Sequence, residues 1–299
     1  METLERKKAT DFPQELLDLF HLYVHGEIDR NAFLAGATNF AAGDVTASDL
    51  FAMLKPNYAL AVQVPETDAR LAVGEATVAS PQGNGSIKGY LVGPAGTHGK
   101  RPAVLVVHEN RGLNPYIKDV ARRLAIEGYL AFAPDALSSL GGYPGDDEKA
   151  GELFKSLNRD KMTEDFVAAA TWLGALSDVG KVGVIGFCYG GGVANTIAVR
   201  MPTLSAAVPF YGQAPASTDV AKIKAAVEAH YAELDTRLTS QWPAYDAEMT
   251  AAHVRHEGYI YPQTNHGFHN DTTPRYDEAA AKLAWSRTLS WFDRYLKSA

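Results

Sequence analysis

The chain has 299 residues, of which 46% are hydrophobic and 21% are charged, as expected for a globular protein of one large or two small domains. Its formal net charge of −7 disfavours nucleic acid as a partner, because a phosphate backbone requires a basic patch and the sequence shows no cluster of Lys and Arg. The one cysteine excludes an intrachain disulfide and a multi-cysteine metal site, and it fits a reducing compartment.

The stretch 32–61 is the least polar part of the N-terminal region. It contains three charged side chains, whereas a membrane-spanning helix needs about 20 uninterrupted apolar residues. Residues 29–34 are similar to the core of a twin-arginine export signal, but Asn31 stands where the second arginine belongs. We therefore expect a cytoplasmic protein without membrane contact, with the periplasm as the minor alternative.

The N-terminal region predicts helices, since residues 11–54 carry a helical apolar face. The proline-containing segments 55–58 and 64–66 predict an extended linker. We therefore divide the chain into a helical extension with its linker, residues 1–65, and a larger domain, residues 66–299. Three roles stay open for the extension: a cap over the site, a surface for homodimer formation, or a remnant of an export segment.

Strands and helices alternate from about residue 71 onward, which predicts an α/β fold with a mainly parallel sheet and helices on both faces. The run 103–107 is apolar throughout, as is typical of a buried parallel strand. The strands are expected at residues 76–79, 87–92, 103–107, 129–133, 182–185, 206–211, 227–231 and 258–261. The helices are expected at residues 117–127, 161–176, 191–200, 242–253 and 276–296, with a loop at 135–145.

The motif Gly-Phe-Cys-Tyr-Gly at residues 186–190 joins a predicted strand to a predicted helix, as a nucleophile elbow does. The turn is strained, and the glycines let the strand and the helix pass closely. The helix N-terminus is expected to lower the pKa of the Cys188 thiol. A phosphate-binding loop is disfavoured because no lysine follows the glycines. We therefore expect Cys188 to be a nucleophile rather than an inert buried cysteine.

An elbow enzyme needs a histidine late in the chain, and His266 meets this requirement. It lies just after the predicted strand 258–261, at the sheet edge where the sites of open α/β sheets are found. The glycine that follows it lets the ring approach the elbow. His269 is the competing histidine.

The acid is expected to be Asp235, which follows the predicted strand 227–231. A carboxylate there can accept the second ring proton of the histidine and fix its tautomer. Glu233 and Asp246 are weaker alternatives. The chain order nucleophile, acid, histidine is that of the α/β-hydrolases.

Four stretches of the sequence resemble the dienelactone hydrolase family, also described as carboxymethylenebutenolidase-like. They are residues 107–114 (VHENRGLN), 131–135 (AFAPD), the elbow, and 265–268 (NHGF). The resemblance covers about residues 80–296 and is made specific by a cysteine in place of the commoner serine. It implies an α/β-hydrolase fold and hydrolysis of small-molecule esters or lactones through a thioester, with no metal and no organic cofactor.

The resemblance also assigns residue roles. Glu109 matches a glutamate that contacts the resting thiol and moves when substrate arrives. The backbone amides of Asn110 and Tyr189 match the oxyanion hole. The family holds a substrate carboxylate with arginines, one of them shortly after the catalytic histidine. Residues 267–271 contain no arginine, so Arg275 and Arg111 are the candidates for that role.

Two other kinds of protein would also account for this fold. One is a non-enzymatic scaffold, which is disfavoured because the nucleophile, the acid, the histidine and the elbow glycines are all present. The other is a redox or acyl-transfer protein. The redox variant is disfavoured because the chain has no second cysteine to resolve a sulfenic acid.

Overall fold

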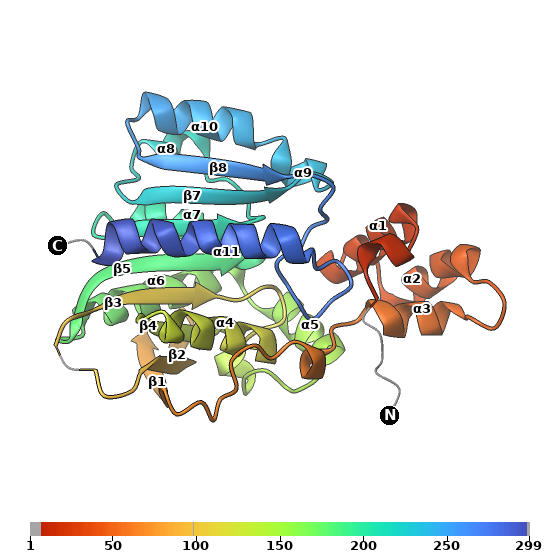
Figure 1. The fold of residues 1–299 in the computed structure, drawn as a ribbon, viewed down its shortest axis with the longest axis horizontal. Coiled ribbons are helices and arrows are strands. Elements are labelled where there is room, and N and C mark those ends of the chain that lie inside the picture. Colours follow the sequence, from red (N-terminus) through yellow and green to blue (C-terminus); the bar gives the residue numbers. More distant parts are fainter. Residues whose placement is uncertain (1–6, 98, 298–299) are drawn as a thin grey trace.

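The strands predicted from the sequence form an eight-stranded sheet in the order β1-β2-β4-β3-β5-β6-β7-β8 (Figure 1). The computed structural model describes residues 7–97 and 99–297. β1 pairs antiparallel with β2, and β2 with β4, while all other neighbours are parallel. The strands are β1 Leu71–Ser80, β2 Gly85–Pro94, β3 Arg101–Val107, β4 Leu130–Asp135, β5 Val179–Phe187, β6 Ala206–Phe210, β7 Ala226–Ala232 and β8 His256–Tyr261. The predicted α/β class with a mainly parallel sheet is confirmed.

Helices cover both faces of this sheet. α4 and α11 pack on one face, and α6, α7 and α10 pack on the other. The helices of the larger domain are α4 Pro115–Ile126, α5 Asp147–Ser156, α6 Arg159–Ala175, α7 Tyr189–Arg200, α8 Ser217–Val220, α9 Thr236–Thr239, α10 Trp242–Ala251 and α11 Glu278–Phe292. A π-helical turn, Asp293–Lys297, continues α11.

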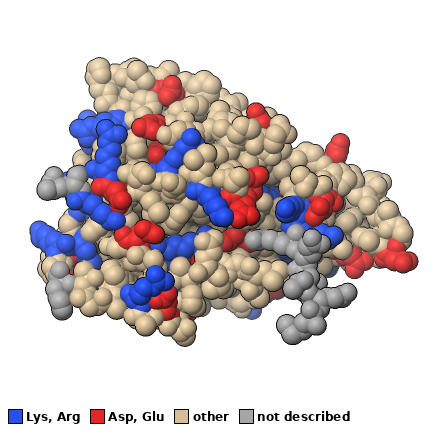
Figure 2. Space-filling view, in the orientation of Figure 1, with Lys and Arg blue, Asp and Glu red and all other residues tan. Residues whose placement is uncertain are grey.

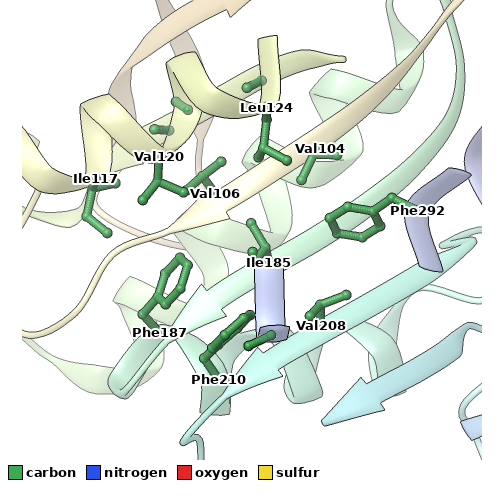
Figure 3. Close-up of a cluster of buried hydrophobic side chains, with 14 of the residues drawn as sticks. Val104, Val106, Ile117, Val120, Leu124, Ile185, Phe187, Val208, Phe210 and Phe292 are labelled. Atoms are coloured by element: carbon green, nitrogen blue, oxygen red, sulfur yellow. The ribbon is translucent and has the colours of Figure 1, made fainter. Parts of the chain in front are cut away.

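The hydrophobic core on the α4 face of the sheet explains why the central strands contain continuous runs of apolar residues. All five residues of the segment 103–107 are fully buried, because helices cover the sheet on both sides. Figure 3 shows side chains from three strands and two helices meeting in this layer. Its labelled members are Val104, Val106, Ile117, Val120, Leu124, Ile185, Phe187, Val208, Phe210 and Phe292. Burial of this apolar surface is the main stabilising contribution here.

The central strand β3 determines where a site can form. Its neighbours are β4 on one side and β5 on the other, so the connections after β3 and β5 leave the sheet at its topological switch point. Ligands bind outside the carboxyl ends of the strands at such points. The loop that follows β3 begins at His108, and the turn that follows β5 contains Cys188.

Three N-terminal helices form a small cluster beyond the carboxyl ends of the strands (Figure 1). They are α1 Gln14–His25, α2 Arg30–Ala37 and α3 Ala47–Leu54. Their shared core contains Leu16, Phe20 and Phe33, so the predicted apolar face is used for packing. The segment similar to an export signal therefore contributes a core residue, Phe33, of a folded helix. The division at residues 65 and 66 stays a prediction, since the sheet begins at Leu71.

The structure differs from the sequence prediction mainly after β4. The sequence left residues 146–160 unassigned, whereas α5 occupies most of that stretch after a short 3-10 turn at Ala136–Leu140. The last helix begins at Glu278 rather than at residue 276, because Asp277 accepts the N-cap bond from the Ala280 amide at 2.8 Å.

Acidic and basic side chains are interspersed on the face shown in Figure 2. No helix among the described residues is both long and apolar enough to cross a membrane.

Candidate active site

Cys188 occupies a strained turn between β5 and α7, with φ 56° and ψ −115°. Its backbone N–H donates to the carbonyl of Phe210 at 3.0 Å, and its own carbonyl accepts the N–H groups of Gly191 and Gly192. These bonds fix a conformation that a non-glycine residue rarely adopts. The predicted elbow is therefore present, and it holds the thiol at the end of the central strands.

The elbow glycines are required by close backbone approach. A Cβ atom on Gly186 would lie 1.9 Å from the carbonyl oxygen of Gly190, and one on Gly190 would lie 2.3 Å from that of Val107. Real Cβ atoms do not approach backbone atoms so closely, so neither position tolerates a side chain without movement of the main chain.

His266 and Asp235 lie at the ends of neighbouring strands and form a close pair. Nδ1 of His266 lies 2.5 Å from Oδ2 of Asp235, and both side chains are buried. Burial alone would raise the pKa of the Asp235 carboxyl, but the hydrogen bond and charge of His266, together with Arg237, outweigh burial and lower it. Burial lowers the pKa of His266, so the ring is neutral. Nδ1–H then donates to Asp235, and Nε2 is left as an acceptor.

His269, the competing histidine, is packed in the hydrophobic core. Its Nδ1 bonds the hydroxyl of Tyr116 at 2.7 Å, and its ring stacks on Phe187 within the core. His269 does not line either of the two cavities that contain Cys188. This arrangement favours His266 as the ring that serves the thiol.

The rival acids also lie elsewhere. Asp246 accepts a bond from Nε2 of His256 at 3.1 Å, and Glu233 accepts the N–H of Gln263 at 2.8 Å. Of the three carboxylates considered from the sequence, Asp235 is therefore the one that pairs with His266.

Glu109 follows β3 and lies close enough to Cys188 for its charge to act on the thiol. Its Oε2 atom accepts a hydrogen bond from the side-chain amide of Asn270 at 2.8 Å. Burial raises the pKa of Glu109, although the charge of Arg275 and the bond from Asn270 oppose this rise.

The prediction that the helix N-terminus would lower the thiol pKa is wrong for this resting state. Burial, reinforced by the charge of Glu109, raises the pKa of Cys188 to about 12. A hydrogen bond from the backbone N–H of Tyr189 opposes this rise without cancelling it. Desolvation of the thiolate outweighs the helix terminus, so the resting thiol keeps its proton.

Arg275 lines the same cavity as the thiol and is buried, and its Nε and Nη1 atoms have no hydrogen-bond partner in the part of the chain that the structure describes. Its guanidinium carbon lies 5.7 Å from the centre of the Phe20 ring. Arg111 lines the same cavity but donates to the carbonyls of Asn110 and Val24. The two arginines considered from the sequence therefore differ, because only Arg275 has buried donors available for a ligand.

Two cavities meet at Cys188 and His266. One, of about 60 Å³, is lined by residues that include Glu109, Arg275 and Phe20. The other is more open, has about 340 Å³, and is lined by residues that include Asn110, Tyr189, Arg159 and Arg237. Both predicted oxyanion-hole residues thus border the space above the thiol.

The helical extension contacts the loops around this site. The side-chain amide of Asn110 donates to the carbonyl of Val24 at 2.8 Å, and Gln14 donates to the side chain of Asn265 at 2.7 Å. Lys55 forms an ion pair with Glu148 at 2.8 Å. Of the three roles left open for the extension, these contacts favour a cap, because they hold α1 over the site.

Sequence reasoning missed several residues here. The rings of His21 and His25 on α1 lie 5.1 and 4.9 Å from the ring of His266. Their spacing of four positions on a helix was a usable signal, because such residues share one helix face. Asn270, which holds Glu109, and Arg237, which lies close to Asp235, gave no comparable signal.

Comparison with known proteins places this arrangement in a family. A model of the dienelactone hydrolase family matches residues 87–296. The chain belongs to this family. A second model, described as YqhI-like, matches residues 4–43, which lie in the helical extension.

Individual proteins are similar to this chain over shares that range from about a third to three quarters of its length. "Putative carboxymethylenebutenolidase" of Salmonella typhi is 31% identical over 240 residues, covering 75% of this chain and 88% of its own length. "Putative hydrolase fragment YghX" of Escherichia coli is 62% identical over 109 residues, covering 36% of this chain and 93% of the fragment. The crystal structure of a "Putative Dienelactone Hydrolase" from Klebsiella pneumoniae has 28% identity and a TM-score of 0.65, covering 75% of this chain and 100% of that one.

These matches confirm the predictions of the family, of the α/β-hydrolase fold and of a hydrolase. The roles of individual residues stay predictions.

Proposed function

We propose that this protein hydrolyses ester or lactone bonds of small molecules through a covalent thioester on Cys188. The observation that carries the proposal is that the elbow cysteine and His266 line the same two cavities, while the buried Asp235 pairs with the other nitrogen of the His266 ring. A nucleophile, a base and an orienting acid are the three parts that acyl transfer needs. The family relationship supports the same chemistry.

The reaction begins from a protonated thiol. When the substrate binds, Nε2 of His266 takes the proton of Cys188, and the thiolate attacks the carbonyl carbon of the ester. Asp235 holds Nδ1–H and stabilises the imidazolium that forms. Because the resting thiol has a raised pKa, its ionisation must be favoured by the bound substrate.

The negative charge that develops on the carbonyl oxygen needs hydrogen-bond donors. Asn110 and Tyr189 line the cavity above the thiol, and their backbone amides are the proposed donors. The tetrahedral intermediate then collapses, the carbon–oxygen bond of the leaving group breaks, and His266 returns the proton to that oxygen. Water, deprotonated by His266, attacks the thioester, the carbon–sulfur bond breaks, the carboxylic acid leaves, and His266 returns the proton to the sulfur of Cys188.

Glu109 and Arg275 are proposed to assist the reaction without exchanging protons with the substrate. The carboxylate of Glu109 keeps the thiol protonated until substrate arrives, which protects it from oxidation and alkylation. Arg275 offers two donor nitrogens that bond to no described residue, and it is proposed to bind a carboxylate on the substrate. No metal or organic cofactor enters any of these steps.

The test compares hydrolysis of short p-nitrophenyl esters and lactones by the parent protein and by Cys188→Ala. We expect the variant to lose turnover, and hydrolysis that continues unchanged would refute the proposal. His266→Ala should lower the rate at least ~10²-fold, as loss of a general base does. A matched His269→Ala variant, compared per folded molecule, should retain more activity; the reverse order would assign the base to His269.

The cytoplasmic location expected from the sequence, the absence of a nucleic-acid partner and the possibility of a homodimer stay predictions.

A further inference from the structure

Three histidine rings meet where the helical extension covers the site. His21 and His25 come from one face of α1, and His266 comes from the loop after β8. One ring nitrogen of each lies within 4.8 Å of the corresponding atoms of the other two. Helix α1 and the β8 loop are far apart in the sequence, so the cluster exists only because the extension docks on the larger domain.

Two of these nitrogens are buried and have no hydrogen-bond partner among the described residues. They are Nε2 of His25 and Nε2 of His266. A buried polar atom left in this way is costly, so such atoms are normally satisfied by a ligand, an ion or water. Both atoms belong to residues that line the larger cavity at Cys188, which leaves space for an additional ligand.

We propose that His21, His25 and His266 bind a divalent transition-metal ion of the Zn²⁺ class, and that the bound ion reversibly inhibits the hydrolase. Zinc binds imidazole nitrogens at about 2.0–2.1 Å, which places the nitrogens of a tetrahedral site about 3.3 Å apart. The separations here exceed that value by at most about 1.5 Å, and small side-chain rotations close such a gap. Imidazole ligands suit Zn²⁺, Co²⁺, Ni²⁺ and Cu²⁺ rather than Mg²⁺ or Ca²⁺.

The surroundings of His266 favour a metal ligand. Histidines that bind metal through one ring nitrogen usually donate the other N–H to a carboxylate, which orients the ring and strengthens the bond to the metal. Asp235 occupies this position, 2.5 Å from Nδ1. The three protein ligands leave a fourth position for water from the cavity that Cys188 also lines.

Inhibition follows from the atom involved and rests on the proposed function. Nε2 of His266 must accept the thiol proton, and a metal ion bound to Nε2 withholds the same lone pair. The ion would also connect α1 to the β8 loop, which fastens the extension over the site. A bound ion would therefore stop turnover, and it would also stabilise the extension in its position over the site.

The test uses the full chain, stripped of metal with EDTA and dialysed, and titrated with Zn²⁺ by calorimetry. We expect one Zn²⁺ per chain, with an increase in melting temperature on binding. His21→Ala and His25→Ala should each weaken Zn²⁺ binding by about tenfold or more, because each removes one proposed ligand of the ion. His21→Gln repeats the test with a polar side chain, should the alanine variant fold poorly.

Two control variants identify the ligands. His253→Asn removes an exposed histidine outside the cluster, and asparagine tolerates its φ of 57°. Cys188→Ser removes the alternative ligand, the thiol. Both should keep the affinity of the parent protein. Titration with Co²⁺ should give the visible spectrum of a nitrogen-ligated ion without a thiolate charge-transfer band.

The hydrolysis assay separates the two claims. For each protein, activity with Zn²⁺ is divided by its own metal-free activity. This ratio should fall with occupancy in the parent, recover with EDTA, and stay near one in His21→Ala. Absence of binding at millimolar Zn²⁺, unchanged affinity in the histidine variants, or activation by Zn²⁺ would overturn the inference. If the metal-free protein hydrolyses no ester, the proposed function fails while the binding result still decides the site.

Discussion

Nδ1 of His266 lies 2.5 Å from Oδ2 of Asp235, while Nε2 of the same ring is buried and bonds to none of the residues that the structure describes. The pair thus fixes the tautomer whose free nitrogen can accept a proton. Asp235→Asn should reverse this preference, because an amide can donate to Nδ1 and leave the proton on Nε2. We expect kcat for a p-nitrophenyl ester to fall about 10²–10⁴-fold. Asp246→Asn, which alters an acid paired with His256, is the control, and an equal loss in both variants would contradict the assignment.

The reactivity of the resting thiol should depend on Glu109. Removing its charge in Glu109→Gln should lower the pKa of Cys188 from about 12 towards its ordinary value. Each unit by which that pKa falls gives about tenfold more thiolate at pH 7.5. Iodoacetamide should therefore alkylate the variant faster than the parent in the absence of substrate. As a control, the two proteins should be alkylated at equal rates after denaturation. Equal alkylation rates in the folded proteins would show that Glu109 does not act on the thiol.

The same substitution predicts a pH dependence of stability. Burial raises the pKa of Glu109 in the folded protein, so the folded state holds this proton more tightly than the unfolded state. Stability from this group is therefore complete below its unfolded pKa and is lost as pH rises through the folded value. Glu109→Gln should raise the melting temperature relative to the parent at pH 7.5, and the difference should vanish near pH 4. A variant that is less stable at pH 7.5 would contradict this sign.

Two neighbouring glycines offer a matched test of the elbow. A Cβ atom on Gly190 would lie 2.3 Å from the carbonyl oxygen of Val107, whereas one on Gly192 would approach nothing closer than 3.5 Å. Gly190→Ala should cost more than about 2 kcal/mol of unfolding free energy. Gly192→Ala should stay within about 1 kcal/mol of the parent, since alanine favours the helix. Urea denaturation measures both, and similar values for the two variants would argue against the close approach at residue 190.

Arg275 should determine selectivity for charged substrates. Its buried guanidinium has unpaired donors, whereas Arg111 donates to two backbone carbonyls. Arg275→Gln should lower kcat/KM for a carboxylate-bearing p-nitrophenyl ester about 10–100-fold more than for its neutral counterpart, the range for hydrogen bonds to charged groups. Arg111→Gln is the control. An unchanged ratio between the two esters in Arg275→Gln would remove the proposed carboxylate site.

The sequence predicted the parts of this protein that depend on local pattern. Buried parallel strands appear in the sequence as runs of apolar residues. The elbow glycines mark a turn at which only glycine allows the close backbone approach, so the sequence predicted both features. The acid and the histidine followed from chain order and from strand ends. These signals depend on neighbours in the sequence, which a single chain displays directly.

Long-range contacts could not be predicted in the same way. The thiol pKa depends on burial and on Glu109, which lies in the loop after another strand, so the expected lowering by the helix terminus was wrong. The docking of α1, which brings His21 and His25 against His266, depends on the shape of two assembled surfaces. Helix α5 was missed because its stretch followed a loop rich in glycine and proline.

The most direct test of the central claim is to trap the acyl enzyme. The parent protein is mixed with a p-nitrophenyl ester, quenched in acid during turnover and digested for mass spectrometry. We predict an acyl group on the peptide that contains Cys188, which disappears when the substrate is exhausted. Cys188→Ala should show neither the adduct nor turnover. Turnover by the parent with the acyl group on another residue, or turnover by Cys188→Ala at the parental rate, would contradict the account.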